Sequence, residues 1–234
     1  MFPYHAAMSP PTELSDQPPQ DPLAVLARWL EEARASAAQP NPNAMVLATC
    51  DDAGHPSARV VLCKGLATAP GYIVFYTNYL SRKGRDLAAN ARAAAVFHWD
   101  AAHRQARIEG PVVKSPPEES EAYFASRPWQ SRLGAWASRQ SEPTESRATL
   151  EQALAAAARR FGTPVPDHTG RAQPFDGPIV RPPHWGGYRL WAETVELWVE
   201  GDARIHDRFL WRRALRKQGE TLQGGPWTVA RLQP

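Results

Sequence analysis

Cysteine is scarce in this chain of 234 residues, which contains only Cys50 and Cys63. Two cysteines that both fall in expected strands give no disulfide framework, so we expect a reducing, cytoplasmic setting. No group of His and Cys residues has the spacing of a metal site, and we expect no metal ion. The sequence also lacks a Gly-x-Gly-x-x-Gly motif, so it does not support a Rossmann nucleotide site.

Long apolar runs are absent as well. No stretch approaches the length that crosses a bilayer, so we expect no contact with a membrane. Residues 1–20 contain no Lys or Arg and no apolar segment, so we expect no secretory signal there. The same stretch is rich in Pro and Ser, a composition that predicts disorder.

Lysine is also rare, since only four of the 27 basic residues are lysines and 23 are arginines. Arginine suits bidentate capture of phosphate and carboxylate groups, although a compositional bias of the genome explains the same count. The formal net charge is only +3, and the basic residues are dispersed along the chain. This pattern does not favour nucleic-acid binding.

Apolar residues are sufficient for a core, at 43% of a chain whose length suits one domain over 21–234. Expected helices cover 21–37, 81–90, 115–127 and 145–161, and expected strands cover 44–50, 57–64, 71–78, 92–99, 104–114, 187–191, 195–199, 204–211 and 227–232. Six prolines make 162–183 a loop insertion. Many antiparallel strands with a few helices predict an α+β or mainly-β barrel.

The stretch from Arg59 to Lys83 organises this pattern as strand, turn, strand and helix start. Ser81 is a good N-cap, which puts Arg82 and Lys83 in the first helical turn. Cations there oppose the helix dipole, unless an anion binds the free backbone N–H groups beside them. With Arg59 and Lys64, these cations would then surround the phosphate of a ligand. A surface helix start with solvated charges explains the same residues equally well.

Arg59 and Lys64 lie five residues apart, so an ideal strand directs them to opposite faces. Both reach one site only if the strand contains a bulge or if Lys64 lies beyond its end. The sequence leaves both possibilities open.

Two further groups of polar residues have the spacing of shared faces. Tyr123 and Arg127 lie four apart on an expected helix, where they share one side. Arg204, His206 and Arg208 alternate along an expected strand and so share one face. Without further information, a solvated face is the preferred interpretation of the second group, and a surface pair accounts for the first.

Eight short motifs, taken in order, resemble the pyridoxine/pyridoxamine 5′-phosphate oxidase family. The resemblance extends from about Asp21 to Pro234 and so covers nearly the whole chain. The motifs are Arg59–Lys64, Phe75–Asn78, Ser81–Lys83, Arg104–Gln105, Tyr123–Pro128, Gly134–Ser141, Trp185–Gly187 and Arg204–Arg208.

The resemblance implies a split β-barrel that forms a homodimer with FMN between its subunits. The implied reaction, part of vitamin B6 metabolism, oxidises pyridoxamine or pyridoxine 5′-phosphate to pyridoxal 5′-phosphate. Dioxygen is the acceptor, and the products include hydrogen peroxide, with ammonia from the amine substrate. The flavin carries this chemistry, while the protein supplies orientation and electrostatics.

The family's functional positions carry over residue by residue. The implied FMN contacts are Arg59, Val60, Val61, Leu62, Cys63, Lys64, Tyr76, Thr77, Ser81, Arg82, Lys83, Gln105, Gln140, Ser141, Trp198 and Arg208. The implied substrate contacts are Lys64, Tyr123, Arg127, Ser131, Arg204 and His206. Arg204 and His206 are the implied catalytic residues, and whether His206 is a base or only holds the substrate stays open.

The chain departs from the family at its N-terminus, where relatives often carry an Arg and a Tyr that close over the substrate. Here no Lys or Arg precedes Arg28, and Tyr4 is the only upstream tyrosine, which puts that lid in doubt. Two alternatives to the implied function are a flavin oxidase of the phenazine-biosynthesis type and a non-catalytic flavin- or pyridoxal-phosphate-binding protein. The retained substrate contacts argue against the first.

Overall fold

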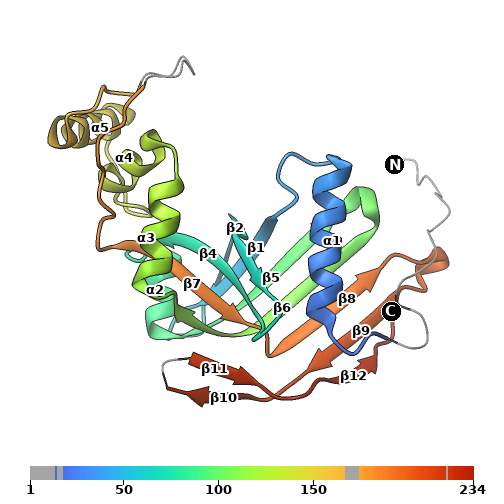
Figure 1. The fold of residues 1–234 in the computed structure, drawn as a ribbon. Coiled ribbons are helices and arrows are strands. Elements are labelled where there is room, and N and C mark those ends of the chain that lie inside the picture. Colours follow the sequence, from blue (N-terminus) through green and yellow to red (C-terminus); the bar gives the residue numbers. More distant parts are fainter. Residues whose placement is uncertain (1–13, 15–17, 167–173, 220) are drawn as a thin grey trace.

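The structure is a computed structural model that describes residue 14 and residues 18–166, 174–219 and 221–234. Within these ranges a ten-stranded antiparallel sheet combines with helices, which confirms the expected α+β class (Figure 1). The helices are α1 (Pro22–Ser36), α2 (Arg82–Ala89), α3 (Pro117–Ser126), α4 (Trp129–Ala137) and α5 (Arg147–Phe161). The strands are β1 (Ala44–Cys50), β2 (Pro56–Leu62), β3 (Gly65–Ala67), β4 (Tyr72–Asn78), β5 (Arg92–Trp99), β6 (Arg104–Lys114), β7 (Trp185–Trp191), β8 (Thr194–Val199), β9 (Asp207–Arg212), β10 (Leu215–Gln218), β11 (Thr221–Gly224) and β12 (Thr228–Arg231).

Local signals in the sequence predict most of these boundaries correctly. At the start of α1, the Asp21 side chain accepts a hydrogen bond from the backbone N–H of Leu23 at 2.9 Å. Ser81 caps α2 in the same way, accepting from the N–H of Gly84 at 3.4 Å. These side chains satisfy backbone donors that the first helical turn leaves unpaired.

The sheet is built around β6, which pairs with three other strands. Residues 104–109 of β6 pair with β8, residues 112–114 pair with β7, and β5 runs along the opposite edge. From β6 the order continues through β5 and β1 to β2, and through β7 and β4 to β3. Only Cys63 and Lys64 separate β2 from β3, so the chain joins both ends of this path and the sheet curls into a half-barrel.

Gly110 lies on β6 between the segment paired with β8 and the segment paired with β7. A Cβ atom on Gly110 would lie 2.0 Å from the carbonyl oxygen of Trp191, at the end of β7. Because backbone atoms cannot yield as a flexible side chain can, only glycine fits here. The two branches of the sheet therefore separate at a point of close backbone contact.

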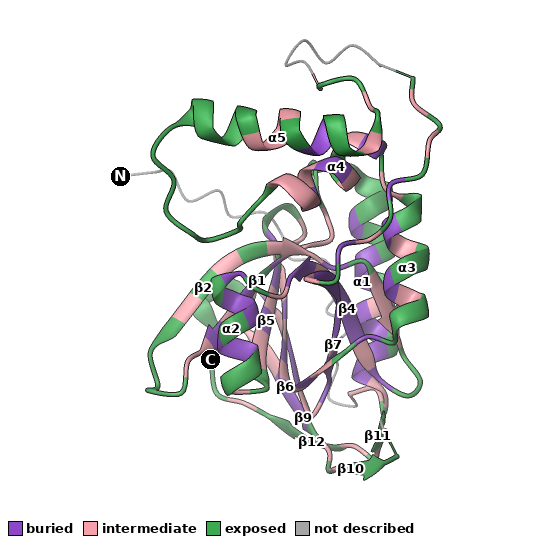
Figure 2. Ribbon diagram, turned by 90° about the vertical axis from the view of Figure 1, so that its left-hand side faces the viewer, coloured by how far each residue is buried: buried purple, intermediate pink, exposed green. Residues whose placement is uncertain are grey.

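The main core lies between α1 and one face of the sheet. It includes Leu26 and Trp29 from α1, Leu197 from β8 and Trp211 from β9, which are all at most 1% exposed. Figure 2 shows buried residues along β4 and β7 as well. Along β8, Val195, Leu197 and Val199 face this core, so the alternate residues occupy the opposite face of the sheet.

A second cluster of buried residues joins α3, α4 and α5. We call these helices the helical arm, and Figure 1 shows the arm and α1 at opposite ends of the sheet. Phe124 from α3, Leu133 from α4 and Ala158 from α5 meet in this cluster, and each is at most 1% exposed. Trp185, the first residue of β7, packs among them and fixes the arm to the sheet.

The prediction that Arg204, His206 and Arg208 alternate along one strand is wrong, because β9 begins only at Asp207. A 3-10 turn covers Asp202–Arg204, and Ala203 and Arg204 have positive φ angles of 52° and 65°. A left-handed backbone interrupts an extended strand, so alternation does not apply before Asp207.

The prediction that Arg127 lies on a helix face with Tyr123 is also wrong. Arg127 is the C-cap of α3, with an extended backbone at φ −76° and ψ 148°. The physical reason is Pro128, because a proline disfavours the helical conformation in the residue before it. The 115–127 prediction thus ends one residue late.

Helix α4 and strands β3, β10 and β11 are not anticipated by the sequence pattern. Most of the segment predicted to be disordered, 1–20, lies outside the described residues, as does 167–173 of the predicted loop 162–183. Within 1–20, Leu14 is buried and the carbonyl of Pro19 accepts a hydrogen bond from Trp211 Nε1 at 3.0 Å. The described residues of 162–183 contain no helix or strand.

Candidate active site

A cavity of about 840 Å³ lies where β2 and β4 meet the helical arm. Its walls come from β2, from the end of β4, from the start of α2, and from α3, α4 and the turn after α4. The lining residues are Ser57, Ala58, Arg59, Val60, Val61, Leu62, Lys64, Tyr76, Thr77, Asn78, Arg82, Lys83, Tyr123, Arg127, Ser131, Gly134, Ala135, Ser138, Gln140, Ser141 and Trp185. Segments far apart in the sequence thus contribute to one space.

Lys83 is the most unusual group in this cavity, because its side chain is buried and no described residue forms an ion pair with it at hydrogen-bond distance. Nζ donates to Thr77 Oγ1 at 3.2 Å, to Ser81 Oγ at 3.2 Å and to Gln140 Oε1 at 3.1 Å, which are all neutral acceptors. Burial, followed by repulsion from Arg59, lowers the pKa of Lys83 to about 8. An anion beside Nζ would offset this cost.

Arg59 adds a second cation to the same part of the cavity. Its guanidinium donates to Thr49 Oγ1 and Ser57 Oγ, each at 2.7 Å, and to the Leu47 carbonyl at 3.2 Å. The carboxylate of Asp86 lies 3.8 Å away, and burial lowers the pKa of Arg59. With Lys83 and the exposed Arg82, Arg59 gives the cavity three cations close to the N-terminus of α2.

Arg127 is the cation at the helical-arm side of the cavity. Its guanidinium carbon lies 4.6 Å from the ring centroid of Trp185, in a cation–π contact. Its Nη1 atom is buried and has no hydrogen-bond partner among the described residues, and burial lowers the pKa of the group. A buried donor without an acceptor destabilises the folded state, unless a ligand accepts a hydrogen bond from it.

The aromatic wall beside Arg127 is formed by Tyr76, Tyr123 and Trp185. The rings of Tyr76 and Tyr123 stack at 3.9 Å between centroids, and Tyr76 is nearly parallel to Trp185 at 5.6 Å. The Tyr76 hydroxyl donates to Glu119 Oε1 at 3.4 Å. Burial and then Glu119 raise the pKa of Tyr76, so its phenol stays protonated at neutral pH.

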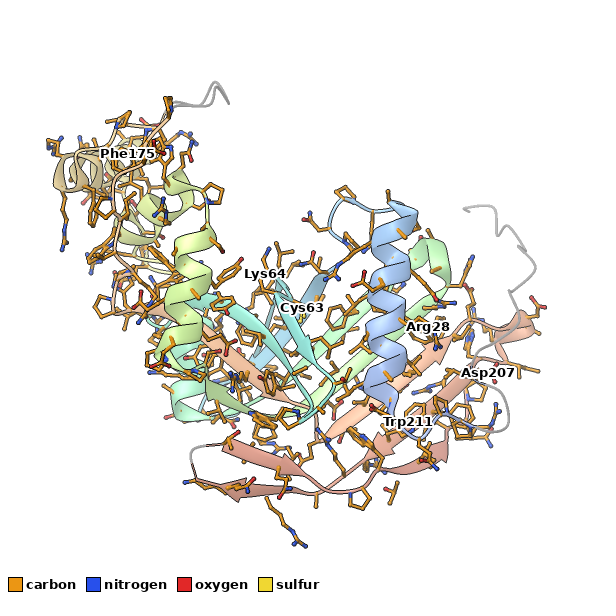
Figure 3. The ribbon with its side chains drawn as sticks, viewed as in Figure 1. Arg28, Cys63, Lys64, Phe175, Asp207 and Trp211 are labelled. Carbon is orange, nitrogen blue, oxygen red and sulfur yellow. The ribbon has the colours of Figure 1, made fainter. Side chains whose placement is uncertain are left out.

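Lys64 enters the cavity because β2 ends two residues before it, at Leu62. The question of how Arg59 and Lys64 reach one site is therefore answered by the end of the strand. Figure 3 shows Lys64 and the buried Cys63 between the helical arm and α1. The backbone N–H of Lys64 donates to the Val74 carbonyl at 2.8 Å, which attaches this short connection to β4.

The structure therefore brings together most of the predicted FMN and substrate contacts. Cys63 and Ser81 are buried beside the cavity and do not line it, whereas Ser57, Asn78, Ser138 and Trp185 line it without having been predicted individually. Asn78, Ser138 and Trp185 all belong to the motifs that carry the family resemblance, which is the signal that could have identified them.

Besides Cys63 and Ser81, five more of the predicted site residues do not line the cavity. They are Gln105, Trp198, Arg204, His206 and Arg208. Trp198 lies opposite both Gln105 and Arg208 in the sheet register, and its ring centroid is 4.7 Å from that of His206. Asp207, which precedes Arg208, lies on the far side of α1 from Lys64 in Figure 3.

Three of these separated residues lie on the face of β6, β8 and β9 that points away from the main core, whereas Arg204 and His206 precede β9. Gln105, Trp198 and Arg208 alternate with the buried residues Ala106, Leu197 and Phe209 along their strands. We call this surface the outer sheet face. It carries a second set of polar and aromatic groups, distinct from those of the cavity.

Two stretches of the sequence match known protein families. Residues 31–161 match the family described as "Pyridoxamine 5'-phosphate oxidase", and residues 185–234 match the "Pyridoxine 5'-phosphate oxidase C-terminal dimerisation region". The fold and these matches define a flavoprotein oxidoreductase with a split-barrel fold.

Similar sequences narrow this class further. The chain is 48% identical over 214 residues to a pyridoxine/pyridoxamine 5'-phosphate oxidase of Burkholderia lata, covering 92% of this chain and 89% of that one. It is 45% identical over 219 residues to the protein of the same name from Rhodospirillum rubrum, covering 92% and 97%. The chain belongs to the pyridoxine/pyridoxamine 5'-phosphate oxidase family.

Solved structures agree with this assignment of the fold. PhzG from Burkholderia lata, determined in complex with tetrahydrophenazine-1-carboxylic acid, superposes with a TM-score of 0.77 at 27% identity, covering 95% of this chain and 97% of that one. A pyridoxamine 5'-phosphate oxidase-related, FMN-binding protein from Nostoc punctiforme gives 0.61 at 16% identity, covering 90% and 96%. At that identity the second likeness concerns the fold alone.

None of the helices in the described ranges is long and apolar enough to cross a membrane. Within the same ranges, no three His, Cys, Asp or Glu side chains gather as the ligands of a metal ion would.

Proposed function

We propose that this protein is an FMN-dependent oxidase that converts pyridoxamine or pyridoxine 5'-phosphate to pyridoxal 5'-phosphate. One observation carries the proposal: a single cavity contains two separate cationic regions. Arg59, Arg82 and Lys83 form the first, and Arg127, stacked on Trp185, belongs to the second. We assign Lys64, which also lines the cavity, to the second region. FMN and the substrate each bear one phosphate, so two anion sites in one cavity suit this pair of ligands.

The residues of the first region fit the phosphate of FMN. Among the described residues, the buried Lys83 ammonium donates to three neutral acceptors, so a phosphate would supply an anion at hydrogen-bond distance. The N-terminus of α2 adds backbone N–H groups and a favourable dipole for an anion. When bound, FMN would accept a hydride from the substrate and deliver the electrons to dioxygen, giving hydrogen peroxide.

The second region fits the phosphate of the substrate. The Nη1 atom of Arg127 has no hydrogen-bond acceptor among the described residues. A phosphate oxygen would accept a charge-assisted hydrogen bond from it. Tyr123 and Ser131 line the same part of the cavity and offer two hydroxyl groups. Stacking on Trp185 holds the guanidinium in place before the ligand arrives.

We further propose that the active enzyme is a homodimer in which the outer sheet face of one subunit completes the cavity of the other. Val46 on β1 and Val60 on β2 continue that face in register with Arg107. They are exposed apolar residues, at 42% and 67%, and Val60 also lines the cavity. The matched C-terminal dimerisation region includes Trp198, His206 and Arg208. A partner subunit would thus bury the apolar surface and bring the separated residues to the flavin.

A spectroscopic experiment tests this function. The purified protein is expected to show the visible absorbance of bound FMN, and anaerobic pyridoxamine 5'-phosphate should bleach it. Readmitting oxygen should restore the colour and release hydrogen peroxide in proportion to pyridoxal 5'-phosphate. Colour that pyridoxamine 5'-phosphate does not bleach would argue for a non-catalytic flavin-binding protein, and absence of flavin would contradict the proposal altogether.

The alternative of a phenazine-biosynthesis oxidase has one observation in its favour, the superposition on PhzG. The sequence identity to PhzG is 27%, against 48% to the Burkholderia lata oxidase, so the proposal favours the B6 substrate. A reduced phenazine carboxylic acid tested in the same assay distinguishes them. Faster flavin reduction by that compound than by pyridoxamine 5'-phosphate would reverse the preference.

A further inference from the structure

Glu196 is a carboxylate buried in the outer sheet face, at 2% exposure. It lies on β8 between two arginines from the neighbouring strands. Its Oε1 accepts from Arg208 Nε at 3.0 Å and from Arg208 Nη2 at 2.8 Å, while its Oε2 lies 2.7 Å from Arg107 Nη2. One carboxylate oxygen therefore accepts hydrogen bonds from Arg208, whereas the other forms an ion pair with Arg107 and accepts no hydrogen bond from the described residues.

Arg208 is restrained at all three of its guanidinium nitrogens. Besides the two bonds to Glu196, its Nη1 donates to the backbone carbonyl of Gln233 at 3.0 Å. The β8–β9 register places Arg208 directly opposite Trp198 and diagonal to Glu196. The guanidinium is thus held beside Trp198, in an orientation that leaves two of its five N–H groups available.

A purely structural role does not account well for this arrangement. Burying a carboxylate costs several kcal/mol in desolvation, and replacing a buried ion pair by apolar residues is often neutral or stabilising. The strands already pair through their backbones, and Val195 and Leu197 provide apolar packing on the other face. What the carboxylate adds is a fixed orientation of the Arg208 guanidinium group.

We propose that Glu196 is a positioning residue, which holds the Arg208 guanidinium in the orientation that contacts FMN. This inference rests on the proposed function, in which Arg208 reaches the flavin of the dimer. Glutamine cannot replace the carboxylate at this position, because if its Oε1 faces Arg208, its NH₂ group opposes the Nη2 donor of Arg107.

The experiment measures the Kd of FMN for the apo-protein by flavin fluorescence in four proteins: wild type, Glu196→Gln, Arg208→Gln and the double variant. We expect Glu196→Gln to weaken FMN binding about 10-fold, the equivalent of about 1.4 kcal/mol. In the Arg208→Gln background the same change should have little effect, because there is no guanidinium left to orient. Such non-additivity is the signature of direct coupling.

Glu109→Gln serves as the matched control. Glu109 is a second carboxylate on the outer sheet face, it pairs with Arg107 at 2.8 Å, and it is 41% exposed. Its loss should leave the Kd of FMN unchanged. Glu196→Asp keeps the charge but withdraws the carboxylate by one methylene, so it should fold and still lose FMN affinity, even if the glutamine variant fails to fold.

Several results would overturn this inference. They are an unchanged Kd in Glu196→Asp, an equal loss on adding Glu196→Gln to wild type and to Arg208→Gln, and a loss accompanied by dissociation of the dimer in sedimentation. A wild-type protein that binds no FMN would overturn the proposed function together with this inference. A wild type that binds FMN, with Glu196 variants that bind it equally well, would overturn this inference alone.

Discussion

Replacing Arg127 by alanine is expected to remove much of the enzyme's ability to recognise the phosphate of its substrate. The Nη1 atom of Arg127 is buried and has no hydrogen-bond partner in the described part of the chain, so a phosphate oxygen there gains a charge-assisted hydrogen bond. Such a bond contributes roughly 1.5–3 kcal/mol, which corresponds to a loss of about 10- to 150-fold in kcat/KM. Lysine should restore only part of this, because an ammonium cannot fork onto two oxygens.

The assay compares kcat/KM for pyridoxamine 5'-phosphate with kcat/KM for pyridoxamine, which lacks the phosphate. Wild type should strongly prefer the phosphorylated form, and Arg127→Ala should reduce that ratio. Arg159→Ala, on the exposed side of α5, is the matched control and should leave the ratio unchanged. If the ratio is the same in Arg127→Ala as in wild type, Arg127 does not recognise the phosphate and our reasoning is wrong.

Arg127→Ala also removes the cation–π contact with Trp185, which contributes about 0.5–2 kcal/mol. A lower melting temperature is therefore expected in the variant. Because both substrates are measured on the same folded protein, this loss cancels in the ratio. The comparison of substrates thus separates recognition from stability.

Four further predictions concern the cofactor, the dimer and the imidazole. Changing Arg82 and Lys83 together to alanine should release FMN on desalting, since these cations lie at the proposed phosphate site, and retention equal to wild type would contradict that assignment. Mixed dimers of Arg82→Ala and Arg208→Ala subunits should regain one intact site each, and verified heterodimers that stay inactive would count against a site shared between subunits. The pKa of Lys83 is lowered to about 8, so its ammonium loses its proton as pH rises through that value. FMN affinity should therefore fall as pH rises through about 8, and Lys83→Arg should show no such step; an identical fall in that variant would refute the role of Lys83. Because the N–H of Gly201 donates to His206 Nδ1 at 3.2 Å, the neutral ring carries its proton on Nε2 and serves as a donor. His206→Gln, whose amide reaches the Nε2 position, should then retain more kcat/KM than His206→Asn, and the reverse order would point to a different role.

Local chemistry made much of the fold predictable from the sequence. Asp21 and Ser81 cap their helices as their side chains suggested, and β5 and β6 have the predicted bounds. These elements depend on capping and on alternating burial, which a short window of sequence contains. The cavity residues Arg59, Lys83 and Arg127 were identified through family motifs, whereas the burial of Lys83 and the unpaired Nη1 of Arg127 appear only when distant segments meet.

Other features could not be predicted because backbone geometry overrides the pattern. Arg204 and His206 alternate as a strand would, yet Arg204 has φ 65° and neither belongs to β9. The side chains of Ala203 and Arg204 do not predict a left-handed backbone, because that conformation is usually adopted by glycine or asparagine. Helix α4 begins directly after Pro128 without a side-chain cap, and Gly134 in its interior has low helix propensity, so the usual signals of a helix are weak there.

Strand β6 pairs with β8 before Gly110 and with β7 after it, so one strand connects the two branches of the sheet. The same strand carries Gln105 and Arg107 on the outer sheet face and, beyond Gly110, pairs with β7, whose first residue Trp185 anchors the helical arm. Any side chain at position 110 would clash with the backbone at Trp191 and push β6 away from the end of β7. The absence of a side chain at Gly110, which does not line the cavity, thus keeps the cavity wall and the outer sheet face at their present spacing.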